Sequence, residues 1–69
     1  MVEVFKTNVR EQADATRLLE KLAEHLPYHK INFDLQDCDK VLRVEGDYFL
    51  PCRIIDLLQE EEYICIVLE

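Results

Sequence analysis

The stretch from residue 30 to residue 46 constrains the fold more than any other part of the chain. Apolar residues alternate with polar ones on both sides of a polar segment: Ile31, Phe33 and Leu35 before it, and Leu42 and Val44 after it. Alternation with a period of two is typical of strands that bury one face. The segment between them contains two aspartates, whose short carboxylates accept hydrogen bonds from nearby backbone amides and favour a turn. The pattern therefore predicts a β-hairpin, closed by Gly46.

One strand and one helix are predicted before the hairpin. Residues 2–6 are mainly β-branched and aromatic, which favours a strand. Asn8 and Glu11 have the spacing of a capping pair, so we expect a helix to begin near them. Its apolar stripe, at helical spacing, is Ala15, Leu18, Leu19, Leu22 and Leu26. Pro27 is expected to end this helix.

A second helix and a last strand are predicted after the hairpin. Pro51 suits the first position of a helix, where its missing N–H costs nothing. The buried stripe of this helix is expected to be Ile54, Ile55, Leu57 and Leu58. Residues 63–67 then read as a strand, with Ile64 and Ile66 facing the helices together with Leu68. The other set, Tyr63, Cys65 and Val67, is expected to lie on the uncovered face of the sheet.

The order strand, helix, strand, strand, helix, strand predicts an α+β fold. Two right-handed strand–helix–strand units interleave into a ferredoxin-like βαββαβ sandwich, a four-stranded antiparallel sheet of order 4-1-3-2 with two helices on one face. Residues 1–69 are expected to form a single domain. A chain of this length buries only about 60% of its unfolded surface, so we expect a thin core and no internal cofactor cavity.

Charge and cysteine content narrow the partners and the compartment. The chain has 15 acidic and 8 basic side chains and a net charge of -7, which disfavours nucleic acid and anionic membranes. Its longest apolar run, residues 64–68, is far short of the roughly 18 residues of a membrane span. Three cysteines do not make a disulfide framework, and reduced thiols are typical of the cytoplasm. We therefore expect a cytoplasmic protein without membrane or nucleic-acid partners.

The predicted topology brings three loops to one end of the domain. They are the loop after the first strand, the hairpin turn and the loop after the second helix. Their acidic residues and one thiol are Glu11, Asp14, Asp37, Cys38, Asp39, Glu60, Glu61 and Glu62. Only Arg10 and Lys40 oppose this charge. The acidic end is therefore one candidate surface for a protein partner, and His25 and His29, separated by Pro27, are expected to be surface residues elsewhere.

The run Val4-Phe5-Lys6, followed by a loop and then Leu18-x-x-x-Leu22, resembles the heavy-metal-associated domain family of small copper chaperones. In that family the first loop carries Met-x-Cys-x-x-Cys, whose two thiolates bind Cu(I) or another soft ion. If the leucines match the first-helix positions of the family, the two cysteines fall at Glu11 and Asp14. The resemblance thus implies the family's fold, without its thiolate pair.

Catalysis has little support in the residues. The chain has no serine, no Gly-rich phosphate loop and no metal triad. We expect a non-catalytic small binding module that contacts a protein partner, or a second copy in a homodimer, through the acidic end or the open sheet face. The alternative is Cu or Zn handling through Cys38 and nearby carboxylates, alone or across a dimer. In the first reading no cofactor is required.

Overall fold

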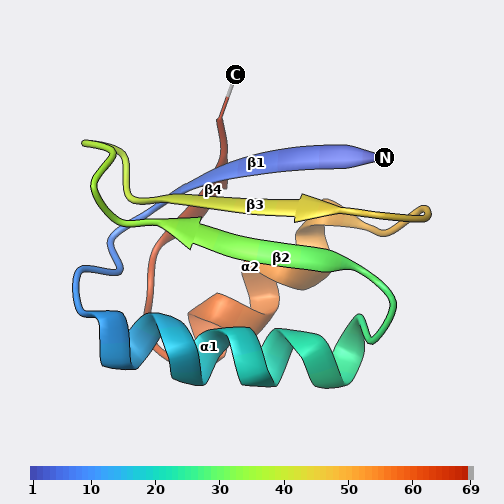
Figure 1. Cartoon of the computed structure of the whole chain (residues 1–69), viewed down its shortest axis with the longest axis horizontal. Coiled ribbons are helices and arrows are strands. Elements are labelled where there is room, and N and C mark those ends of the chain that lie inside the picture. The colour runs from blue at the N-terminus through green and yellow to red at the C-terminus, as the bar shows by residue number, and fades with distance from the viewer. Residues whose placement is uncertain (69) are drawn as a thin grey trace.

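Four strands and two helices follow one another in the predicted order (Figure 1). They come from a computed structural model of the chain, which describes residues 1–68. The elements are β1 (Val2–Thr7), α1 (Gln12–His25), β2 (Lys30–Asp34), β3 (Val41–Glu45), α2 (Pro51–Glu60) and β4 (Cys65–Val67). Within this range neither helix combines the length and the apolar character that a membrane crossing requires.

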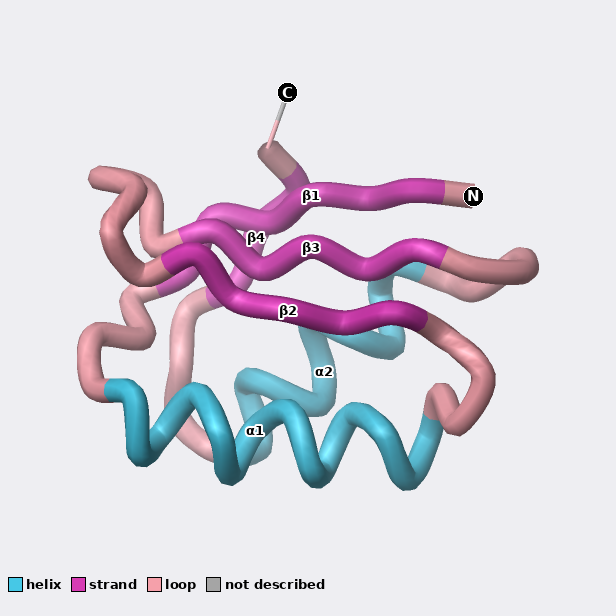
Figure 2. The backbone as a smooth tube through the Cα atoms, viewed as in Figure 1, coloured by secondary structure: helices cyan, strands magenta, loops and turns pink. Residues whose placement is uncertain are grey.

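The strands form one antiparallel sheet of order β2-β3-β1-β4. Read from the other edge, this is the predicted order 4-1-3-2, so the ferredoxin-like fold is confirmed. β1 is an inner strand, and Phe5 pairs with Leu42 of β3 on one side and with Val67 of β4 on the other. Both helices cover the same face of the sheet and leave the other bare (Figure 2).

The core lies between the helices and the covered face of the sheet. α1 contributes Ala15, Leu18 and Leu22, α2 contributes Ile54, Leu57 and Leu58, and the strands contribute Phe5, Leu42, Val44 and Cys65, all buried. The alternating apolar residues of β2, Ile31 and Phe33, pack against this core and are partly buried, as does Ile55 of α2. The helical stripes and the hairpin alternation predicted from the sequence are therefore confirmed, except at Leu19, which is half-buried and does not pack on this core.

The predicted orientation of the last strand is wrong by one residue. Cys65 is only 2% exposed and faces the helices, whereas Ile64 is 62% exposed and Ile66 is 52% exposed. Cys65 pairs with Thr7, another buried residue, which sets the face of β4. Period-two alternation could not decide the face, because both sets of residues in residues 63–68 are apolar.

The predicted capping role of Asn8 is also wrong. The residue before α1 is Glu11, and no side-chain hydrogen bond caps this helix. Asn8 Oδ1 instead accepts a hydrogen bond from the backbone N–H of Ile64, at 2.9 Å. The side chain thus joins the loop after β1 to the start of β4. The two prolines act as expected, since α1 ends before Pro27 and Pro51 begins α2.

His29 is not a plain surface residue. Its Nε2 donates to the backbone oxygen of Asp47 at 2.8 Å, and its ring meets Phe49 edge to face, with centroids 5.5 Å apart. The ring covers Gly46, whose φ is +157° and where a Cβ atom would lie 2.5 Å from His29 Cδ2. The chain therefore needs glycine at this position for both backbone conformation and space.

Candidate functional site

Three loops meet at one end of the sheet, as the topology predicted (Figure 1). Thr7 Oγ1 donates to the backbone oxygen of Lys40 at 2.6 Å, and the Thr7 N–H donates to that of Asp39 at 3.1 Å. These bonds tie the end of β1 to the hairpin turn. The bond between Asn8 and Ile64 ties the same loop to the segment after α2. Hydrogen bonds therefore hold the three loops of this end together.

Three of the seven acidic residues at this end form ion pairs with cations of α1. Lys21 Nζ lies 3.1 Å from Glu60 Oε1 and 3.2 Å from Glu61 Oε2. Arg17 forms ion pairs with Glu61 and, at 3.4 Å, with Asp14. Lys21 first, and Arg17 with it, lowers the pKa of Glu61. The acidic end is therefore partly neutralised by these two cations, which lie on α1 outside its buried stripe.

The hairpin tip holds Asp37, Cys38 and Asp39, with ligand atoms within 4.8 Å of one another. Both carboxylates have other partners: Asp37 Oδ1 accepts from the Asp39 N–H at 2.9 Å, and Asp39 lies 3.6 Å from Lys6 Nζ. Beside the tip is an open hollow lined by Thr7, Asn8, Arg10, Cys38 and Lys40. Cys38 therefore has Arg10 and Lys40, the two cations expected at this end, as well as carboxylates around it.

Glu11 and Glu62 complete the predicted set. Both are exposed, and no ion pair among residues 1–68 includes them. Glu11 precedes α1, and Glu62 lies in the turn after α2 with a φ of +67°. The structure therefore brings the predicted residues to one end, but divides them between the α1 ion pairs, the hairpin tip and two free carboxylates.

The face of the sheet away from the helices is the second candidate surface. We call it the open face. Its residues alternate with the buried ones along each strand: Val2, Val4 and Lys6 from β1, Lys30, Asn32 and Asp34 from β2, Val41, Arg43 and Glu45 from β3, and Ile64, Ile66 and Leu68 in and beside β4. Leu68 belongs to it because its N–H donates to the Val4 oxygen, at 2.8 Å, which continues the β1–β4 ladder.

One half of the open face, over β1 and β4, is apolar. We define the apolar strip as Val2, Val4, Ile64, Ile66 and Leu68. All but Val4 are counted among the exposed large apolar side chains of the chain. Single exposed apolar residues are ordinary on protein surfaces, whereas a contiguous group marks a surface that contacts something apolar. The strip is therefore the part of the molecule best suited to a hydrophobic contact.

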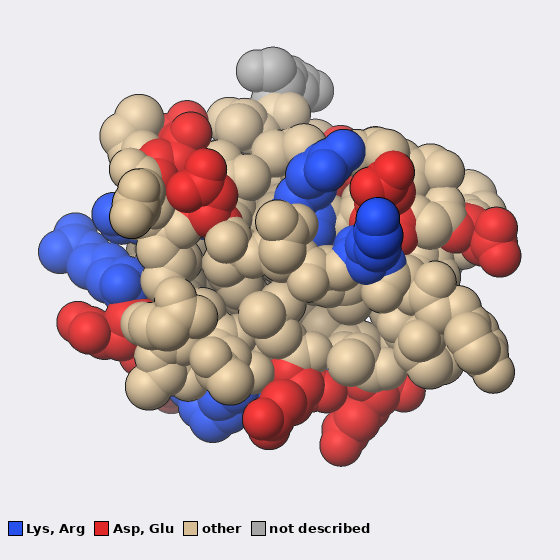
Figure 3. Space-filling model, in the orientation of Figure 1, with Lys and Arg blue, Asp and Glu red and all other residues tan. Residues whose placement is uncertain are grey.

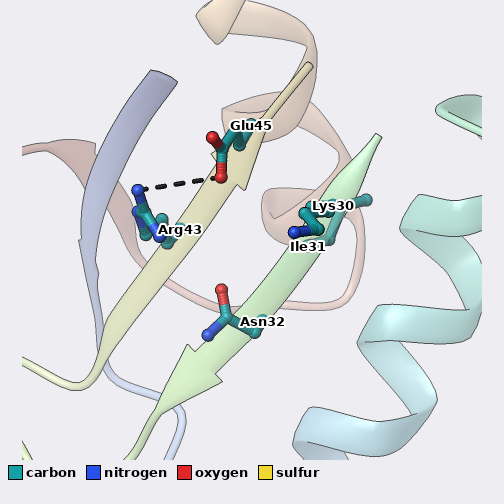
Figure 4. Close-up of a pocket in the computed structure, with 5 residues that line it drawn as sticks. All are labelled: Lys30, Ile31, Asn32, Arg43 and Glu45. Atoms are coloured by element: carbon teal, nitrogen blue, oxygen red, sulfur yellow. Dashed lines mark ion pairs between the residues drawn. The ribbon is translucent and has the colours of Figure 1, made fainter. Parts of the chain in front are cut away.

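The other half of the open face, over β2 and β3, is charged and hollowed (Figure 4). Lys30, Asn32, Arg43 and Glu45 line an open depression of about 390 Å³ together with Ile31. Arg43 Nη2 lies 3.7 Å from Glu45 Oε2 in the same strand. Lys30 and Asp34 stand at opposite ends of β2, and neither takes part in an ion pair within the described chain.

The open face differs in charge from the rest of the molecule. It carries three cations, Lys6, Lys30 and Arg43, and two carboxylates, Asp34 and Glu45, for a net charge of +1. Since the whole chain carries -7, the other residues together carry -8. Figure 3 shows carboxylates along the edge where α1 runs and also at both ends of the sheet, with cations among them. The acidic character predicted from composition therefore belongs to the helical layer and the loops.

Comparison with known proteins gives no relative to guide the assignment. The chain matches no protein-family model, no curated protein and no solved structure.

The two halves of the open face differ in how clearly the sequence predicts them. The polar residues of β2 and β3 alternate clearly with apolar ones, whereas Ile64 and Ile66 lie among other apolar residues and were assigned to the core.

Proposed function

We propose that this chain is a non-catalytic protein-binding module that acts through the open face of its sheet. The observation that carries the proposal is the apolar strip, which places Ile64 and Ile66 in water at 62% and 52% exposure. An apolar centre with a polar and charged rim is the usual anatomy of a protein interface. The charged half, with Lys30, Asn32 and Arg43, supplies that rim.

The open face is preferred here to the acidic end. A basic partner at the acidic end would have to compete with Arg17 and Lys21, which already pair with Glu60 and Glu61. Contacts to exposed charges are also weak, typically about 0.2–1 kcal/mol each. The apolar strip has no such competitor.

Metal handling at Cys38 is the second candidate. The 4.8 Å grouping of Asp37, Cys38 and Asp39 favours it. Against it, one thiolate and two exposed carboxylates fall short of the four ligands that structural Zn sites use, and soft ions prefer several sulfurs. If Leu18 and Leu22 match the first-helix positions of the heavy-metal-associated family, this chain has Glu11 and Asp14 where that family carries its two thiolates. Native mass spectrometry with Zn(II) or Cu(I) tests this candidate: a stoichiometric adduct that Cys38→Ser abolishes would favour it over the open face.

Affinity capture with matched baits tests the main proposal. The baits are the wild type, Ile66→Lys in the apolar strip, Glu62→Lys at the acidic end, and Tyr28→Lys, which replaces an apolar side chain 93% exposed outside the open face. We expect Ile66→Lys to be the one bait that loses the captured proteins. The wild-type bait should retain them at high salt. Loss with Glu62→Lys, and retention with Ile66→Lys, would instead assign binding to the acidic end.

A further inference from the structure

We propose that the partner of the open face is a second copy of this chain, packed sheet to sheet about a two-fold axis parallel to the sheets and perpendicular to their strands. This inference rests on the proposed function and names the partner. It follows from the pattern of charge on the open face, which is complementary to itself under that one rotation.

The ladder registers arrange the open face in rows that run across the strands. The central row is Asn32, Arg43, Val4 and Leu68. One outer row is Lys30, Glu45 and Val2. The other outer row is Asp34, Val41, Lys6 and Ile66. In the first outer row, β2 and β3 therefore present a positive and a negative charge, and β1 an apolar side chain. In the second outer row, β2 presents a negative charge and β1 a positive one, while β3 and β4 present apolar side chains.

In a dimer with its two-fold axis along the central row, each strand faces the same strand of the partner. Each outer row faces the other outer row of the partner. Lys30 then faces the partner's Asp34, and Asp34 faces the partner's Lys30. Four residues of a strand span about 13 Å, so Lys30 and Asp34 cannot pair with each other within one chain. Neither forms an ion pair among residues 1–68, although Asp34 Oδ1 accepts a hydrogen bond from the Gln36 N–H at 3.2 Å. Glu45 comes within one strand spacing of the partner's Lys6. In the apolar half, Val4 and Leu68 lie on the axis and face their own copies, and Ile66 comes within one strand spacing of the partner's Val2, which itself faces the partner's Lys6.

Arg43 lies on the axis and is therefore near Arg43 of the partner subunit. Its charge is offset within the chain, because Glu45 is 3.7 Å away. The remaining charge opposes this arrangement only weakly. The open faces carry +1 each, and α1 and α2, which point outward on opposite sides of the dimer, carry -1 each, while most of the other negative charge lies in the loops. Stacked sheets are about 10 Å apart, and each helical layer lies beyond its own sheet. The helical layers are thus separated by more than the Debye length of about 8 Å at physiological ionic strength.

The size of the face sets the expected strength. Four strands about 4.8 Å apart and about five residues long give a face of roughly 19 by 17 Å. This is small beside the roughly 800 Å² per partner of a standard interface. We therefore expect a reversible dimer with a Kd in the micromolar range, rather than an obligate one.

Charge reversal tests both the dimer and its axis. Sedimentation equilibrium of the wild type from micromolar to millimolar concentration should show a monomer–dimer equilibrium. Lys30→Glu and Asp34→Lys should each weaken it about tenfold, because each places like charges opposite one another twice. An equimolar mixture of the two single variants should recover a heterodimer, since both pairs then become opposite in charge. Circular dichroism checks that each variant is folded.

Three outcomes would overturn the proposal in distinct ways. A wild type that stays monomeric to millimolar concentration rejects the second copy; if capture by the bait still depends on Ile66, the open-face module survives with another partner. The Tyr28→Lys control should leave the dimer intact. If Ile66→Lys also leaves it intact, self-association uses a surface other than the open face. Single variants that weaken the dimer without recovery in the mixture reject the axis and its Lys30–Asp34 pairing.

Discussion

Replacement of Gly46, the only glycine in the chain, should destabilise the fold through two separable effects. The first is conformational: a residue with a side chain at a φ of +157° costs about 1–3 kcal/mol. The second is steric, because the new Cβ atom would lie 2.5 Å from His29 Cδ2 and the ring must move. Gly46→Ala therefore disturbs the join between β3 and the loop that leads to α2.

The cost of moving the ring follows from its contacts. His29 would lose its hydrogen bond to Asp47, worth about 1 kcal/mol, and its edge-to-face contact with Phe49, worth about 0.5–1.5 kcal/mol. Together with the conformational cost, Gly46→Ala should lower the free energy of unfolding by about 3–5 kcal/mol. A domain of 69 residues is stable by only about 3–10 kcal/mol. The variant should thus be partly unfolded or close to it.

A double-mutant cycle measures the two effects separately. Urea unfolding followed by circular dichroism gives the cost of Gly46→Ala in the wild type and again in a His29→Ala background, where no ring is in the way. We expect the second cost to be smaller by about 1.5–2.5 kcal/mol, leaving the conformational part. Equal costs in both backgrounds, or a cost below about 1 kcal/mol in the wild type, would refute the steric reasoning.

Other predictions concern the loops and the thiols. Thr7→Val removes a donor from a side chain 6% exposed, so urea unfolding should show a loss of about 1–3 kcal/mol; an unchanged midpoint would contradict the role of its bond to Lys40. Because the pKa of Glu61 is lowered in the fold, its stabilising effect is present above its ordinary value of 4.5 and is lost as pH falls below it. Acid titration by circular dichroism should therefore show less stability loss in that range for Glu61→Gln than for the wild type, and identical curves would refute this. Burial raises the pKa of Cys65 to about 12, so iodoacetamide at mildly alkaline pH should label Cys38 and Cys52, both exposed, and spare Cys65 until urea is added; mass spectrometry that finds all three labelled in the native protein would contradict its burial.

Much of the fold could be predicted because single elements have clear local signals. Alternation around residues 36–40 predicts the hairpin, and Pro51 marks the start of α2. The element order then leaves few topologies that avoid left-handed crossovers. The face of β4 had no such signal. An apolar residue occupies nearly every position from 63 to 68, so only the pairing of Cys65 with Thr7 decides it.

The candidate surfaces were harder to predict than the fold. Arg17 and Glu61 are 44 residues apart, and their ion pair depends on the angle at which α1 passes the end of α2. Sequence spacing shows that Arg17 lies on the outer side of its helix, but it does not show what that side meets. In contrast, Lys30 and Asp34 alternate with the partly buried apolar residues of β2 and could be assigned to the open face directly. Local periodicity therefore predicted the polar half of that face, whereas in the apolar half it selected the wrong set of β4 residues.

The inner position of β1 has a consequence for how the chain reaches this fold during synthesis. β1 is made before every other element, yet its two neighbours, β3 and β4, begin at residues 41 and 65. Phe5 therefore lacks both of its neighbouring strands until most of the chain has been made. In contrast, β2 and β3 can pair with each other as soon as both have emerged. Long waits for distant partners slow folding and leave strand edges exposed to other chains. We expect the hairpin to form early, and β1 to close the sheet only when residues 65–67 have emerged.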